Sequence, residues 1–208
     1  MKAQTLESQL ALSHKTILKV LKEGNDRFVA NQKLNRYLVQ QVEETSEGQF
    51  PFATVLSCID SRVPVETVFD QGIGDLFSIR IAGNFVNDDI LGSMEFASKL
   101  AGSKVILVMG HTSCGAVKGA CDDASLGHLT GMLDKIKPAV AAVKSPAESA
   151  KRTSKNIDFV NEVAAMNVFL TIEEIRSRSE VLAEMEREEE ILIVGAMYDV
   201  ATGQVTFY

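Results

Sequence analysis

The chain has 208 residues, of which 46% are hydrophobic and 24% charged, a composition that is ordinary for a folded globular protein. A chain of this length buries a sizeable core, and we expect one domain over residues 1–208. The formal net charge of −7 argues against nucleic acid as a partner, because phosphate binding requires a basic face. No stretch approaches the roughly 20 apolar residues that a membrane helix requires, so no membrane partner is expected.

The start of the chain and its cysteines bear on the cellular compartment. The first residues, MKAQTLESQLALSHKTILKV, are too polar for a signal peptide, and we expect a cytoplasmic protein. The same start also fits a chain from which a secretory leader was removed. The three cysteines, Cys58, Cys114 and Cys121, are too few and odd in number for a disulfide framework. Metal binding or plain burial are the remaining explanations.

In chain order, the first half predicts a helical region and then alternating strands and helices. An apolar stripe predicts a helix over residues 5–30, with an interruption at Gly24–Asn25, and a polar connection over 40–51. Apolar runs rich in β-branched residues predict buried strands over 52–58, 76–83 and 104–111, with a helix over 89–102 between the last two.

The second half predicts mainly helices and ends with two strands. Helices are expected over 112–122, 128–143, 147–165 and 171–188, and strands over 190–199 and 204–208. The short link at 201–203 suits a hairpin turn, so the last strand should be antiparallel. The sequence therefore predicts an α/β domain: a central sheet of about four parallel strands plus an antiparallel C-terminal edge strand, with flanking helices and an N-terminal helical arm.

Two of the predicted strands end in residues that bind metals. Cys58 and His111 close apolar runs, and parallel strands place such ends at one edge of the sheet. Cys114 follows His111 by three residues, so both can point at one centre. Two thiolates and one imidazole are good zinc ligands, and tetrahedral zinc then keeps one open position, as in catalytic sites. The alternative is that the cysteines are small buried residues and the histidine is a satisfied turn residue.

Asp60 and Arg62 follow Cys58 at alternate positions. In an extended stretch alternate side chains share a face, so the three residues can face one site. Beside a zinc site, an arginine that keeps a carboxylate ionised and fixed would have a catalytic purpose. The alternative is a surface ion pair or a turn.

Three motifs give the chain a specific resemblance. CIDSR at 58–62, RIAGNFV at 80–86 and GHTSCGAVKGA at 110–120 resemble the β-class carbonic anhydrases, and most closely the plant-type subgroup in a bacterial form. The likeness covers most of 49–120 and continues in the terminal ILIVGAMYDVATGQV. It implies one zinc ion per chain, held by the side chains of Cys58, His111 and Cys114.

The resemblance also implies a reaction and roles for two further residues. The reaction is the reversible hydration of carbon dioxide to bicarbonate and a proton by zinc-bound hydroxide. The catalytic pair would be Asp60, which orients the hydroxide, and Arg62, which holds the carboxylate. In a closed state, favoured at lower pH, Asp60 would leave Arg62 and become the fourth zinc ligand.

By the same resemblance, substrate-binding residues and a partner are implied. The substrate-binding residues would be Gln49, Phe77, Ala82, Phe96 and Gly115. Phe96 departs from the plant-type tyrosine, which removes a hydroxyl group but keeps the ring. The family's site lies at a subunit interface, so we expect a homodimer or homotetramer, with residues 1–35 packing on a partner subunit.

Two other functions remain open from the sequence. Zinc hydroxide on the same scaffold could hydrolyse carbonyl sulfide or carbon disulfide, which are linear analogues of carbon dioxide. A non-catalytic zinc-binding protein is the other alternative, although it should have a fourth sulfur or nitrogen ligand at useful spacing.

Overall fold

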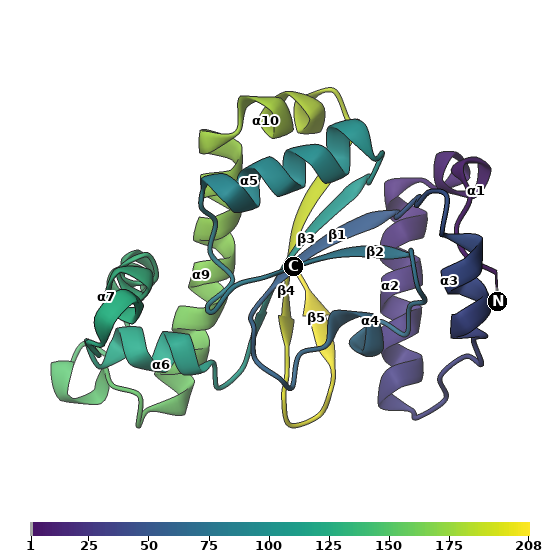
Figure 1. Ribbon diagram of the computed structural model, residues 1–208. Coiled ribbons are helices and arrows are strands. Elements are labelled where there is room, and N and C mark those ends of the chain that lie inside the picture. The colour runs from purple at the N-terminus through teal and green to yellow at the C-terminus, as the bar shows by residue number, and fades with distance from the viewer. Residues whose placement is uncertain (1) are drawn as a thin grey trace.

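A five-stranded mixed sheet forms the centre of the computed structural model, which describes residues 2–208 (Figure 1). The strands lie in the order β2-β1-β3-β4-β5. Their bounds are Ala53–Ser57 for β1, Leu76–Arg80 for β2, Val105–His111 for β3, Leu192–Tyr198 for β4 and Val205–Phe207 for β5. The first four strands are parallel and β5 is antiparallel to β4, which confirms the predicted fold class.

Helices cover both faces of the sheet. Those before β3 are α1 (Leu6–Ala11), α2 (His14–Val29), α3 (Leu38–Glu44), α4 (Val65–Val68) and α5 (Asp88–Glu95), which continues as a π-helical turn over Phe96–Leu100. Those after β3 are α6 (Gly115–Cys121), α7 (Gly127–Asp134), α8 (Lys137–Ala142), a 3₁₀ turn over Ser149–Lys151, α9 (Ile157–Arg178) and α10 (Glu180–Arg187).

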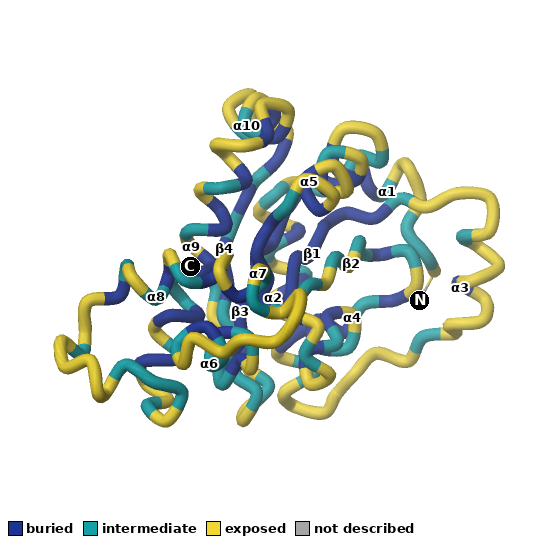
Figure 2. Tube along the Cα trace, turned by 60° about the vertical axis from the view of Figure 1, so that its left-hand side comes forward, coloured by how far each residue is buried: buried dark blue, intermediate teal, exposed yellow. Residues whose placement is uncertain are grey.

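Alternation along β3 builds two separate hydrophobic layers. Val105, Leu107 and Met109 pack with the α2 side, whereas Ile106 and Val108 pack with the α9 side. All seven residues of β3 are buried, as expected for a central parallel strand covered on both faces (Figure 2). The carboxyl ends of β1 and β3 therefore emerge together from a rigid centre.

The N-terminal helical region differs from the expected single helix over 5–30. The break comes at Leu12–Ser13, where the Ser13 side chain caps α2 by accepting from the Thr16 N–H. The helix passes through Gly24–Asn25 without interruption, so the expected bend there is wrong. Gly24 is needed for packing instead, because a Cβ at this position would collide with the Phe69 carbonyl group.

Part of the N-terminal arm packs on the core of its own chain. Ile17 and Leu21 of α2 are fully buried in the core of their own sheet. Packing of residues 1–35 on a partner subunit stays a prediction, and it would involve the other surfaces of this region.

Helix α3 falls largely in the segment that was expected to be a polar connection. The sequence did not indicate a helix there because α3 has only a few apolar residues, and these are exposed.

Later boundaries also shift. The expected helix over 147–165 begins only at Ile157, where Asn156 caps α9, and this helix continues to Arg178. The expected helix over 171–188 is therefore the end of α9 plus α10, which starts at the Ser179 cap. Within residues 2–208, no helix is both long and apolar enough to cross a membrane.

A buried ion-pair cluster fixes the segment between α2 and α3. The Asp70 carboxylate, 3% exposed, accepts from Arg27 Nε and Arg36 Nη1, both at 2.6 Å. It also accepts from the Leu34 N–H, and Arg36 donates to the Asp70 carbonyl oxygen. Burial raises the pKa of Asp70, but these hydrogen bonds outweigh burial and leave the pKa below its ordinary value.

We expect Asp70→Asn to lower the free energy of unfolding by about 3 kcal/mol at neutral pH, because two guanidinium groups lose their buried partner. Since the folded-state pKa of Asp70 is lowered, this stability is present above about pH 4 and is lost as the pH falls through the lowered value. The deficit should therefore shrink in acid, as urea unfolding at several pH values would show. Glu23→Gln, in an exposed pair with Lys19, should cost less than about 1 kcal/mol, and an equal loss in both variants would contradict the prediction.

Candidate metal centre

The pairing of β1 with β3 brings the expected metal ligands together. In the parallel register, Ser57 at the end of β1 lies opposite Met109 of β3. Cys58 follows β1 directly, and β3 runs two residues further to His111. The chain then turns, and Cys114 precedes the first residue of α6. Two strand ends and one helix start therefore deliver three side chains to one point.

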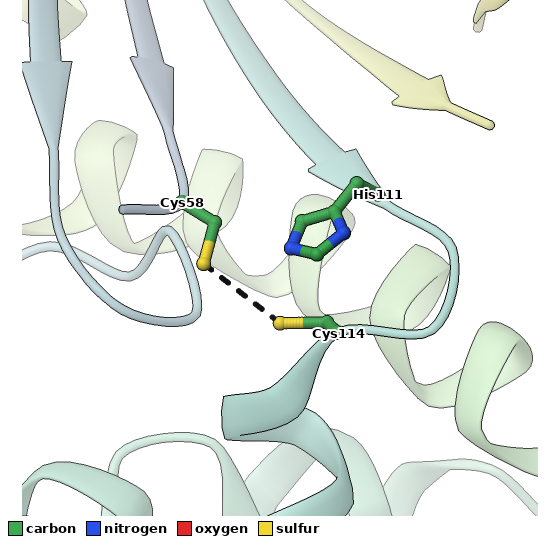
Figure 3. Close-up of side chains that lie close together, drawn as sticks. All are labelled: Cys58, His111 and Cys114. Atoms are coloured by element: carbon green, nitrogen blue, oxygen red, sulfur yellow. Dashed lines mark hydrogen bonds between the residues drawn. The ribbon is translucent and has the colours of Figure 1, made fainter. Parts of the chain in front are cut away.

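Figure 3 shows the three side chains directed toward a common centre. Cys58, His111 and Cys114 are 3%, 0% and 1% exposed, and their ligand atoms all lie within 4.8 Å of one another. The two Sγ atoms are 3.9 Å apart. Among residues 2–208, this is the one group of three or more cysteine, histidine or acidic side chains with such geometry.

The orientation of His111 fits a metal ion. Its Nδ1 lies 2.9 Å from the Thr112 carbonyl oxygen, which only accepts, so Nδ1 carries the proton. Nε2 is then an acceptor, and it is buried without a hydrogen-bond partner in the described chain. A buried nitrogen of this kind is costly unless something satisfies it. A zinc ion bound to Nε2 and the two sulfur atoms satisfies it, with a donor set that zinc prefers.

The two thiols also influence each other's ionisation. Hydrogen bonding with Cys114 lowers the pKa of Cys58 below its ordinary value, although burial opposes this effect. The same contact, together with burial, raises the pKa of Cys114. One of the two sulfur atoms is therefore ready to bind a cation as a thiolate, and the second loses its proton as the metal binds.

Asp60 and Arg62 lie beside the cluster, although not by strand alternation. Strand β1 ends at Ser57, and residues 60–63 form a turn in which the Val63 N–H donates to the Asp60 carbonyl oxygen. The expectation of an extended stretch is thus wrong, and a turn brings the two side chains together instead. Arg62 Nε and Nη2 donate to the two carboxylate oxygens at 2.9 and 2.8 Å, and the Arg62 N–H adds a third hydrogen bond.

The carboxylate points toward the metal cluster in a fixed charge state. Asp60 Oδ2 lies 3.9 Å from His111 Nε2. This distance is too long for a hydrogen bond, but it lets both atoms face the same metal ion. Hydrogen bonds from Arg62 hold the pKa of Asp60 well below its usual range, although burial opposes them. Asp60 is therefore ionised at any physiological pH.

Residues that the sequence did not single out support this turn. Arg80, the last residue of β2, donates through Nε to the Cys58 carbonyl oxygen at 3.0 Å and through Nη2 to the Asp60 carbonyl oxygen at 2.6 Å. The Gly83 N–H donates to Cys58 Sγ at 3.4 Å. RIAGNFV contains both residues, so the motif indicated this segment but not these three hydrogen bonds.

The structure brings only some of the expected substrate-binding residues to the cluster. Gly115 follows Cys114 at the start of α6, and Ala82 lies beside Gly83 in the loop after β2. Phe77 and Phe96 pack edge to face, with ring centroids 6.3 Å apart, and line an open pocket between β2 and α5. Gln49 is exposed and precedes the amino end of β1, so in a single chain it lies at the other end of the strand from Cys58.

Comparison with known proteins gives the same picture over most of the chain. The family model described as carbonic anhydrase matches residues 53–205. A carbonic anhydrase of Mycolicibacterium smegmatis is 34% identical over 193 residues, which cover 90% of this chain and 89% of that protein. Carbonic anhydrase 2 of Mycobacterium tuberculosis is 34% identical over 194 residues, which cover 89% and 88%.

Solved structures share the fold at lower identity. The β-carbonic anhydrase CafA of Aspergillus fumigatus has a TM-score of 0.73 at 24% identity and covers 93% of this chain and 89% of its own. One of two tetrameric β-carbonic anhydrases of Sordaria macrospora has a TM-score of 0.72 at 24% identity, covering 93% and 97%. With the family match and the relatives above 30% identity, these findings show that the chain belongs to the β-class carbonic anhydrases, the zinc enzymes that hydrate carbon dioxide.

Proposed function

We propose that this protein catalyses the reversible hydration of carbon dioxide at a zinc ion held by Cys58, His111 and Cys114, with Asp60 and Arg62 as the orienting pair. One observation carries the proposal: the unpartnered, buried Nε2 of His111 faces two thiols and lies 3.9 Å from a carboxylate that is itself fixed by an arginine. Zinc, when bound, acidifies a water molecule and so provides a nucleophile near neutral pH.

In this proposal Asp60 aligns the attacking oxygen. An ionised carboxylate only accepts hydrogen bonds, so Asp60 would accept one from the O–H of the nucleophile. A lone pair on that oxygen would then point toward carbon dioxide. Arg62 prevents rotation of the carboxylate by binding both of its oxygens. Arg80 contributes by fixing the backbone on both sides of Ile59. Detachment of Asp60 from Arg62 would give the closed, four-coordinate state that the resemblance implies.

We assign the substrate side of the site from the plant-type resemblance. The N–H of Gly115, exposed at the start of α6, would donate to a bicarbonate oxygen, and Ala82 would form part of an apolar wall. Phe77 and Phe96 would extend that wall from the pocket beside β2. Gln49 would have to come from a second copy of the chain, since its own strand separates it from Cys58.

A homo-oligomer is supported by exposed apolar residues around α3. The α3 patch consists of Leu34, Leu38, Val39, Val42 and Ile73, and Val39 is 85% exposed. Figure 2 shows most of α3 as exposed. Clustered large apolar residues of this kind mark association surfaces, and the Sordaria macrospora enzymes are tetramers. We propose that the α3 patch contributes to an interface between copies of this chain.

Removal of the orienting carboxylate should separate catalysis from metal binding. We expect Asp60→Asn to retain one zinc ion per chain but to lower kcat/KM for hydration at least about 100-fold, because a neutral amide has an NH2 group in place of one acceptor oxygen and cannot hold the nucleophile as the carboxylate does. Stopped-flow hydration and metal analysis on the same samples measure both. Asp26→Asn, a matched change at an exposed helical position, should behave as wild type. Wild-type chain that holds zinc but hydrates no faster than Asp60→Asn would contradict the proposal.

The donor set predicts an alkaline pH profile. Two thiolates and a neutral imidazole cancel the formal charge of Zn²⁺, so bound water should be acidified less than at a site of three neutral histidines. Because Asp60 stays ionised to low pH, the profile should report that water, and activity should rise through a midpoint above neutrality. A rate that is already constant above about pH 6.5 would be the opposite result.

The α3 patch gives a test of assembly. We expect Val39→Glu to weaken self-association at least tenfold, or about 1.4 kcal/mol, since it places a charge on an apolar contact. Sedimentation at several concentrations measures the change. Leu126→Glu, the same kind of change at an exposed residue before α7, serves as the control. Equal association by wild type and Val39→Glu would exclude the patch from the interface.

A further inference from the structure

Helix α9 lies directly on β3, which ends at the metal ligand His111, and on its neighbour β4. A Cβ at Gly110 of β3 would lie 2.8 Å from Val168 Cγ2, and one at Gly195 of β4 would lie 2.8 Å from Val168 Cγ1. Both distances are shorter than a real Cβ contact allows. The two glycines therefore leave room for Val168, and α9 can lie close to the sheet. This packing fixes the distance of the neighbouring α9 side chains from the sheet.

The residue before Val168 reaches the loop behind Cys58. Asn167 is 3% exposed, and its Nδ2 donates to the Gly83 carbonyl oxygen at 2.8 Å in a buried hydrogen bond. The N–H of the same glycine donates to Cys58 Sγ at 3.4 Å. One residue thus links a side chain of α9 to a sulfur atom of the metal cluster.

Gly83 needs an external anchor. Its φ of +80° is a conformation that favours glycine, and a Cβ there would collide with the Ile136 side chain. With no side chain of its own, Gly83 is oriented by the hydrogen bonds to its backbone and by those of its neighbour. Thr171, one turn after Asn167, donates through Oγ1 to the Asn84 carbonyl oxygen at 3.4 Å.

The same helix also holds the loop that carries His111 and Cys114. Ser113, between His111 and Cys114, has a φ of +56°, and its N–H donates to Asn161 Oδ1 at 2.9 Å. Asn161 belongs to α9, so this helix is tied both to the loop that carries His111 and Cys114 and to the Gly83 loop that donates to Cys58 Sγ. This second contact supports a positioning role for the helix that is independent of the Gly83 loop.

We propose that Asn167 is a positioning residue of the zinc site: through its hydrogen bond to the Gly83 carbonyl group, it keeps the Gly83 N–H directed at Cys58 Sγ. The proposal rests on zinc binding as set out under the proposed function. A hydrogen bond to a thiolate ligand lowers the electron density that sulfur donates and fixes its direction toward the metal. Loss of the anchor should therefore leave Cys58 Sγ less well directed, which speeds the release of zinc, and should raise the electron density on sulfur, which lowers the energy of its charge-transfer band to the metal.

The test compares Asn167→Leu with Gln9→Met, two near-isosteric replacements of a buried side-chain amide. Gln9 Nε2 donates at 2.8 Å to the carbonyl groups of Pro51 and Ala101, at the opposite end of β1 from the metal cluster. Zinc content is measured first. The release of zinc to an excess of chelator is then followed, together with the thiolate-to-cobalt absorption band of the cobalt-substituted proteins.

We expect Asn167→Leu to release zinc about 10-fold faster than wild type and to shift the cobalt band to lower energy, with Gln9→Met unchanged in both. Thr171→Val, which removes only the longer hydrogen bond to the same loop, should change both quantities in the same direction by a smaller factor. If Asn167→Leu does not fold, wild-type values for Thr171→Val overturn the proposal.

The outcomes separate this inference from the proposed function. A wild-type chain that binds no zinc overturns the proposed function itself. A wild-type chain with one zinc ion, together with unchanged release and an unchanged cobalt band in Asn167→Leu, overturns the role of Asn167 alone. Equal changes in Asn167→Leu and Gln9→Met would likewise overturn it, because they would report a general loss of packing.

Discussion

The parallel pairing of β1 with β3 is the constraint on which the metal site depends. Cys58 and His111 come from segments more than fifty residues apart, and only the register of these two strands sets their separation. A slip by two residues would displace one ligand by about 7 Å along the strand and keep every side chain on its proper face. The hydrophobic pattern alone would accept that slip, so the register must also be fixed by contacts outside the strands.

Polar groups around the strand ends then fix the side chains and the turn that this register brings together. Thr112 fixes one nitrogen of His111, which leaves the other free for a cation. Arg80 holds the backbone of the turn after Cys58, and Arg62 holds the carboxylate that the turn presents. Asp60 and Arg62 thus satisfy each other, and Nε2 of His111 is left without a partner for the metal to bind.

The sequence predicted the parts of this arrangement that follow from local pattern. The ends of apolar runs and the His-x-x-Cys spacing located Cys58, His111 and Cys114, because a buried strand appears in the sequence as a continuous apolar run and a short turn as a fixed spacing. The helix break at Ser13 was mislocated, since a capping serine gives a weaker signal than glycine. The geometry of Asp60 was predicted by alternation but is produced by a turn. Asn167 lies 84 residues from its partner Gly83, and nothing local to either position indicates that they meet.

The two glycines beneath α9 have a consequence for how this protein tolerates change. Gly195 lies on β4 opposite Val108, and the atoms nearest to a Cβ at this position belong to Val168, Tyr208 and Ile172, none of which is in the metal cluster. A single methyl group added there would nevertheless press on Val168, which precedes Thr171 and follows Asn167 in α9. In most proteins the distance between a helix and a sheet affects only the packing of the core. In this protein the distance between α9 and the sheet also affects the geometry of the catalytic centre.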